Sequence, residues 1–228
     1  LETVDDVLIS TAPTTGLIVR EDGLIASSAF NFIQKPTSIL VTLPDGQRSA
    51  AEIVAQDHSR HIVLLRADSV TGKLPVPEAT PADEVRVGHW SLAVGRTFDS
   101  ETPSVSVGVV SAINRIWGRA IQTDCKVSPV NYGGPLIDIQ GRVLGLLVPL
   151  SPQADTEVAG AEWYDSGIGF AVPLTDIFAV LDRLAEGEDL HRGLWGINVK
   201  GKNAMADAAI VAHAMPGSPA AKAGLRSS

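Results

Sequence analysis

The sequence predicts a mostly β fold, either a barrel or a sandwich, followed by a smaller unit of different character. Three observations support this. Residues 1–150 contain many short apolar runs, each ending in Gly, Pro, Asp or Asn. One strong helical pattern follows residue 173, and after a charged linker a new series of a strand, a turn and a short helix is expected from residue 193. Regularly spaced short strands with turn residues between them favour antiparallel β architecture over a parallel α/β sheet.

Turn residues separate the expected strands from the start of the chain. Glu21-Asp22-Gly23 follows the apolar run 16–19, and Pro44-Asp45-Gly46 follows the run 38–43. Proline at the second position of a turn, with glycine soon after it, is favoured by the backbone angles of tight turns. Further strands are expected at residues 24–26, 51–55, 61–65, 90–94, 105–110, 136–139, 142–148 and 167–173. Residues 151–166 are polar and irregular, which indicates a loop.

The helical pattern after residue 173 has one apolar face at helical spacing. Thr175 or Asp176 is expected to cap its start, and Gly187 is expected to end it. We expect this helix to pack against the barrel through Ile177, Phe178, Leu181 and Leu184.

Composition excludes several classes of function. The 228-residue chain has a formal net charge of −8 and no Lys/Arg stripe, so nucleic acid is not expected as a partner. No apolar run approaches the roughly 20 residues that span a bilayer. The chain opens with Leu1-Glu2-Thr3, without a basic n-region, so no signal peptide is expected and a processed segment is suspected. Cys125 is the only cysteine, which excludes an intrachain disulfide. No cofactor is expected.

The run from Thr123 to Leu136, with Asn131-Tyr132-Gly133-Gly134-Pro135 at its centre, resembles the nucleophile loop of the HtrA/DegP branch of trypsin-like serine proteases. That family reads T-D-x-x-I-N-P-G-N-S-G-G-P-L at this point. Other segments are similar to further family motifs: 23–30, 41–46, 57–65, 107–112 and 168–173. Together these motifs are specific, whereas each one alone would be weak.

The resemblance implies a trypsin-like double six-stranded antiparallel β-barrel with a C-terminal helix. Residues 193–228 look like the first part of an α+β PDZ domain, with residues 216–225 similar to its turn and helix. The expected domains are therefore 1–187 for the protease-like domain, 188–192 for a linker and 193–228 for the partial PDZ-like domain. The resemblance also implies an extracytoplasmic or periplasmic location and is compatible with a homo-oligomer.

Carried over position by position, the resemblance places Phe30 at the histidine of the catalytic triad, His61 at the aspartate and Tyr132 at the serine. Val130 falls on the glycine of the oxyanion hole. Acyl transfer needs a hydroxyl whose proton is taken by an imidazole that a carboxylate orients. We therefore expect no enzyme, but a non-catalytic pseudoprotease that binds a protein or peptide partner or acts as a scaffold.

Two other functions stay open from the residues alone. The first is a serine-type endopeptidase that uses non-standard residues. Ser128 or Cys125 would then be the nucleophile, although Ser128 suits a turn before Pro129 and Cys125 suits a small core position. The second is a metal-binding protein in which His58 and His61 supply an H-x-x-H pair.

Two places are expected to bind a partner. Phe30 and Tyr132 either fill the former cleft or line an aromatic peptide groove. The second place is Leu194, Trp195, Gly196 and Ile197, which would lie near the carboxylate-binding loop of a PDZ-like unit and take a peptide by β-augmentation.

Overall fold

The structure, a computed structural model, describes the backbone of residues 2–4 and 7–9 and, in full, residues 13–96, 102–151, 166–201 and 210–226. The chain divides into two compact units, Leu1–Leu190 and His191–Ser228. At the start of the first unit, β1 (Glu2–Val4) and β2 (Val7–Ile9) form an antiparallel pair that the sequence did not predict.

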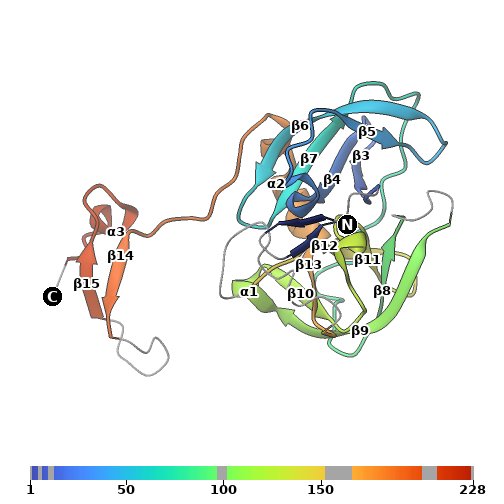
Figure 1. The fold of residues 1–228 in the computed structure, drawn as a ribbon. Helices are drawn as coiled ribbons and strands as arrows, with labels where there is room; N and C mark the ends of the chain where they lie inside the picture. Colours follow the sequence, from blue (N-terminus) through green and yellow to red (C-terminus); the bar gives the residue numbers. More distant parts are fainter. Residues whose placement is uncertain are drawn as a thin grey trace. The chain divides into compact units, whose positions relative to one another are not determined.

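An open five-stranded antiparallel sheet forms the first half of the larger unit, drawn in blue to cyan in Figure 1. Its strands, in spatial order, are β3 (Leu17–Arg20), β4 (Leu24–Ser28), β7 (Ile62–Ala67), β6 (Arg48–Asp57) and β5 (Ile39–Thr42). The prediction of a closed six-stranded barrel is wrong for this half. Among the described residues β3 and β5 do not pair with each other, so the sheet keeps two edges.

A closed barrel of six antiparallel strands forms the second half, as predicted. The strands, in order around the barrel, are β10 (Ala120–Thr123), β13 (Gly169–Pro173), β12 (Val143–Leu147), β11 (Pro135–Ile137), β8 (Trp90–Gly95) and β9 (Ser104–Asn114). The short α1 (Arg115–Gly118) links β9 to β10. Closure leaves every barrel strand with two hydrogen-bonded neighbours.

The predicted helix is confirmed as α2 (Leu174–Ala185). Its buried residues are Leu174, Ile177, Leu181 and Leu184, and they share one core with residues from both sheets, among them Leu64 and Leu146. The prediction that Thr175 or Asp176 caps the start of this helix is wrong. The N-cap is Pro173, without a side-chain hydrogen bond, so Thr175 and Asp176 lie inside the first turn. Gly187 follows the helix with a φ of 88°, the left-handed conformation that ends many helices.

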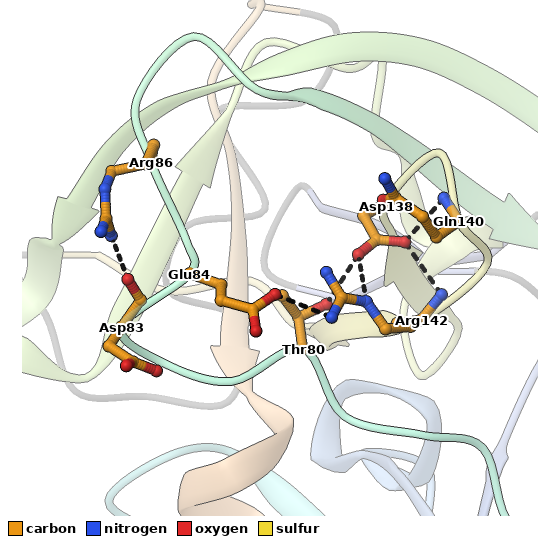
Figure 2. A network of polar contacts seen from close by, with 7 residues as sticks. All are labelled: Thr80, Asp83, Glu84, Arg86, Asp138, Gln140 and Arg142. Carbon is orange, nitrogen blue, oxygen red and sulfur yellow. Dashed lines mark hydrogen bonds and ion pairs between the residues drawn. The ribbon is translucent and has the colours of Figure 1, made fainter.

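A polar network fastens the segment between the two halves to the β11–β12 hairpin (Figure 2). Asp138 accepts hydrogen bonds from the Arg142 Nε, the Gln140 N–H and the Thr80 hydroxyl, at 2.9, 2.9 and 3.2 Å. Arg142 also contacts Glu84 Oε2 at 2.8 Å. Burial alone would raise the pKa of Asp138, but the hydrogen bonds from Arg142, Gln140 and Thr80 together hold its pKa below the ordinary value.

The smaller unit consists of β14 (Ile197–Lys200), β15 (Ile210–Ala214) and α3 (Pro219–Lys222). The two strands are antiparallel, with Ile197 opposite Ala214. Ser218 caps α3, because its hydroxyl accepts the Ala221 N–H at 3.2 Å. The identity of this unit as part of a PDZ domain stays a prediction.

No helix in the described part of the chain is long and apolar enough to cross a membrane.

Candidate functional site

The loop at residues 128–135 is shaped by two glycines and by a turn that two hydrogen bonds between Ser128 and Asn131 close. Asn131 Oδ1 lies 3.2 Å from the Ser128 N–H that donates to it, and the Asn131 N–H donates to the Ser128 carbonyl at 2.8 Å. The turn is the 3₁₀ helix η2 (Pro129–Asn131). Gly133 has a φ of 87°, and a Cβ there would lie 2.3 Å from Thr15 O. A Cβ at Gly134 would lie 2.2 Å from Val94 O, so neither position accepts a side chain without movement.

The backbone N–H groups that follow this turn are used inside the fold. Tyr132 N–H donates to Pro129 O at 3.3 Å, and Gly133 N–H donates to Leu147 O at 2.8 Å. Gly134 N–H donates to Asn131 O at 2.9 Å. Oxyanion stabilisation requires donors that point into an open site. In this conformation these three donors point to protein carbonyls.

Phe30 and Tyr132 lie in the core against each other. Their ring centroids are 5.1 Å apart and the rings are edge to face at 74°. The exposed fractions are 1% for Phe30 and 4% for Tyr132. The 3₁₀ helix η1 (Ala29–Phe32) presents Phe30, and Asn31 Nδ2 donates to Tyr132 O at 2.9 Å, which joins the two segments. The expectation of an aromatic peptide groove at these two rings is therefore corrected: both rings are core residues, and the alternative of a filled cleft describes them.

His61 lies beside the same helix, as a buried residue in the left-handed region with a φ of 57°. Its carbonyl accepts the Ala29 N–H at 2.8 Å, and its Nδ1 lies 3.2 Å from Pro149 O. A histidine with positive φ is uncommon and marks a backbone that its surroundings hold in place. The structure thus brings Phe30, Tyr132 and His61 to one region around η1.

Sequence reasoning did not recognise Asp57 as the centre of the neighbouring turn. This carboxylate is buried and accepts the Ser59 N–H at 2.9 Å and the Ser59 hydroxyl at 2.6 Å. Its Oδ2 contacts Arg60 at 3.0 Å. An aspartate whose side chain accepts the backbone N–H two residues on is typical of an Asx turn. The turn sets the backbone that leads into His61.

The two nucleophile candidates, Cys125 and Ser128, both contact groups that belong to the fold. Cys125 is buried, and its Sγ donates to the Ser91 carbonyl at 3.3 Å. Ser128 Oγ lies 3.3 Å from Asn131 Oδ1, within the turn described above. Buried thiols of this kind mostly act as small core residues.

The structure does not place His58 and His61 in a cluster of metal-ligating residues among the residues that it describes. His58 is exposed and His61 is buried. Over the described ranges, no group of three or more His, Cys, Asp and Glu residues is placed to hold a metal ion.

The segment at Leu194–Ile197 has the opposite character, because the side chains of Leu194 and Trp195 face solvent. Trp195 is 72% exposed, and Leu194 is also exposed. The backbone is nevertheless fixed: Ala220 N–H donates to Trp195 O at 3.1 Å, and Met215 N–H donates to Gly196 O at 2.8 Å. Gly196 has a φ of 72°, and a Cβ there would lie 2.3 Å from Ser218 Cβ.

Comparison with known proteins identifies the class of the larger unit. Residues 14–146 match the family model of the trypsin-like peptidase domain. This match covers more than half of the chain, so the chain belongs to the trypsin-like peptidase family. The relatives that it resembles are named as HtrA- or DegP-like proteases.

Two curated relatives are probable periplasmic serine endoproteases of the DegP-like type. The protein of Chlamydia trachomatis is 33% identical over 93% of this chain and 43% of its own length. That of Halomonas elongata is 32% identical over 93% of this chain and 45% of its own length. The chain thus spans less than half of these relatives. The solved structure of the HtrA-type protease AlgW with a decapeptide matches 94% of this chain and 67% of that chain, with a TM-score of 0.72 and 26% identity.

These comparisons contradict the prediction that the chain is not an enzyme. The relatives are named serine endoproteases, and the solved structure is an HtrA-type protease. The prediction rested on carrying single motif positions over to Phe30, His61 and Tyr132, and membership of a protease family weighs against it. The assignment of these residues to triad positions stays a prediction.

Proposed function

We propose that this chain binds polypeptides in an extracytoplasmic compartment, as an HtrA/DegP-like protein, and that Leu194–Ile197 is its peptide-contacting segment. The observation that carries the proposal is the combination of a fixed backbone with exposed apolar side chains at Leu194 and Trp195. The location follows from relatives named periplasmic.

The geometry of β14 supports binding by strand addition. Among the described strands β14 pairs only with β15, so its other edge has no strand beside it there. An extended peptide that adds to such an edge gains main-chain hydrogen bonds, and neighbouring apolar side chains select its residues. Leu194 and Trp195 lie just before β14 and are separated from it by Gly196 alone. The matched AlgW structure holds a decapeptide, which is in keeping with a peptide as ligand.

The experiment is a binding titration with fluorescein-labelled decapeptides that end in a free, apolar C-terminal residue. Trp195→Ala should weaken binding at least about fivefold, since exposed aromatic anchors carry much of the energy of such contacts. Trp117→Ala, which removes another exposed tryptophan, is the matched control and should leave binding unchanged. Equal affinity of the wild type and Trp195→Ala would reject this segment as the binding site.

A second candidate function is hydrolysis of the bound polypeptide, which the names of the relatives favour. Within the loop 128–135, Ser128 carries the only aliphatic hydroxyl, so it is the serine that such chemistry would use. The test combines turnover of a fluorogenic casein with labelling by a serine-reactive phosphonate. Turnover and labelling that are both lost in Ser128→Ala, but kept in Cys125→Ala, would support this role. Turnover that survives both substitutions would exclude both residues.

A further inference from the structure

A pocket of about 130 Å³ lies at one end of the closed barrel, where β10 and β12 begin and β13 ends. Ile121, Leu144 and Pro173 line it from these three strands. The loop 128–135 lies at the other end of the barrel, because it donates a backbone hydrogen bond to the carbonyl of Leu147, the last residue of β12. The pocket is therefore separate from the candidate site described above.

One wall of the pocket belongs to the segment that the polar network of Figure 2 fastens to the barrel. Thr80 and Ala82 line this wall. The Thr80 hydroxyl donates to Asp138 at 3.2 Å, and Arg142 contacts Glu84 at 2.8 Å. Ala82 lies between these two anchored residues, so its backbone is held on both sides. A wall that is fixed before a ligand arrives lowers the entropy cost of binding.

A second wall is the turn that joins β9 to β10. Asn114 and Gly118 line the pocket from this turn, and both have left-handed backbone, with φ values of 58° and 82°. A Cβ at Gly118 would meet nothing within 4 Å. The turn therefore borders the pocket without filling it.

The charge of the lining limits the class of ligand. No Asp, Glu, Lys, Arg or His lines the pocket among the residues that the structure describes, although the whole chain carries a net charge of −8. An ion that enters a site without a countercharge loses hydration that nothing in the site replaces. The pocket therefore favours an uncharged ligand.

Three polar side chains in the lining can still bind a hydrogen-bonding group. Within the described ranges, neither the Thr175 hydroxyl nor the Asn114 amide has a hydrogen-bond partner. The buried Thr80 hydroxyl donates to Asp138 and keeps lone pairs that can accept a hydrogen bond. A neutral group that both donates and accepts, such as an amide, would match these side chains.

The strands around the pocket favour a small molecule over a peptide main chain. β10 pairs with β9 and β13, and β12 pairs with β11 and β13. These strands offer no free edge, so an extended peptide could not add to the sheet here. Apolar cavities of about 150 Å³ hold a molecule the size of benzene, which sets the scale of the ligand.

We propose that this pocket binds a small uncharged molecule that combines one apolar ring with an amide or a similar hydrogen-bonding group. The ring packs against Ile121 and Leu144, and the polar group bonds to the hydroxyls of Thr80 and Thr175. This site is independent of the peptide-contacting segment 194–197, so the failure of either proposal leaves the other standing.

The test is a titration of the whole chain with benzamide, followed by NMR of ¹³C-labelled methyl groups. The methyl signals of Ile121 and Leu144 should shift with a Kd on the order of 1 mM, as expected for so small a ligand. The signals of Ile62, in the open sheet, should stay in place. Benzoate has the same shape with a negative charge and should bind at least about tenfold more weakly. No shift at Ile121 and Leu144 up to about 20 mM benzamide would overturn the proposal. Equal binding of benzoate would overturn it too.

Two variants with matched controls locate the bound ring. Ala82→Phe fills the pocket from its first wall and should weaken benzamide binding at least about tenfold, because the ring loses its burial. Ala50→Phe makes the same change at an exposed alanine on β6 and should have no effect. Thr175→Val removes a hydroxyl and keeps the side-chain shape, so it keeps the test decisive if Ala82→Phe fails to fold.

Thr175→Val should weaken binding about fivefold, the loss expected for one hydrogen bond. Thr42→Val, at an exposed threonine on β5, is its control and should bind like the wild type. Wild-type affinity in both Ala82→Phe and Thr175→Val would show that benzamide binds elsewhere, and the proposal would then be rejected.

Discussion

The loop 128–135 in the larger unit and the segment 194–197 in the smaller one are built in the same way, but the aromatic side chain of the first is buried and that of the second is exposed to solvent. Each holds a glycine at positive φ where a Cβ would lie 2.3 Å from another atom. Each uses backbone N–H to carbonyl bonds to fix its path. The first turns Tyr132 into the core at 4% exposure, and the second holds Trp195 outward at 72%. Rigid backbone alone therefore does not make a binding loop; the direction of the aromatic side chain decides whether a partner can contact it.

The largest difference between the two loops should appear when their aromatic residues are removed. Tyr132→Ala deletes a buried ring packed on Phe30 and should lower the free energy of unfolding by about 3–5 kcal/mol. Phe30→Ala should cost a similar amount. The measurement is urea unfolding of the larger unit, followed by circular dichroism. A loss below about 1 kcal/mol for Tyr132→Ala would show that this ring is not part of the core.

A double-mutant cycle sharpens the same point. The coupling between Phe30 and Tyr132 beyond their burial should be about 0.5–1.5 kcal/mol, as for edge-to-face pairs. Additive losses in the double variant would mean that the two rings are buried independently of each other.

The second largest effects on stability should come from substitutions of the glycines. Gly133→Ala places a Cβ against backbone at positive φ and should cost about 2–3 kcal/mol of stability in the larger unit. Gly46→Ala is the matched control, because Gly46 also has positive φ but a Cβ there meets nothing within 4 Å. It should cost about 1 kcal/mol. Equal losses in the two variants would show that the close approach at Gly133 is relieved by small shifts.

Gly196→Ala tests the equivalent position in the smaller unit. The added Cβ would meet Ser218, so the segment 194–197 must shift. We expect weaker decapeptide binding in the fluorescence titration and no change in the unfolding of the larger unit, because the two units are separately compact. Destabilisation of the larger unit by this substitution would contradict that independence.

The buried loop is followed by a polar anchor that has no counterpart among the described residues after segment 194–197. Asp138 follows β11, and its pKa is held below the ordinary value by hydrogen bonds that outweigh its burial. A carboxyl whose pKa is lower in the folded chain stabilises the fold above its unfolded pKa, and this stability is lost as the pH falls through the folded pKa. The difference in unfolding free energy between the wild type and Asp138→Asn should therefore shrink from pH 6 to pH 3. Asp68→Asn, which changes an exposed carboxylate, is the control. A difference that stays constant over this range would contradict the assigned shift.

The sequence predicted much of this framework, and the errors have physical causes. Five of the six barrel strands and α2 were predictable because their apolar periodicity is local, whereas β10 was not expected as a strand. The sequence did not predict that the first sheet is open, because whether its edge strands β3 and β5 pair depends on strands that are distant in the chain. The buried contact of Phe30 with Tyr132 was left open, because the two residues lie about a hundred positions apart and either a cleft or a core fits their types.

The smallest effect on stability should come from the outward loop. Trp195→Ala should change the unfolding free energy by less than about 0.5 kcal/mol, because an exposed side chain loses few contacts on truncation. The same variant should lose peptide affinity, so its effects on stability and on binding would be the reverse of those of Tyr132→Ala. Thermal unfolding and the decapeptide titration, run on both variants, measure the two effects. A stability loss above about 2 kcal/mol for Trp195→Ala would mean that this indole is buried in solution, and the contrast between the two loops would then disappear.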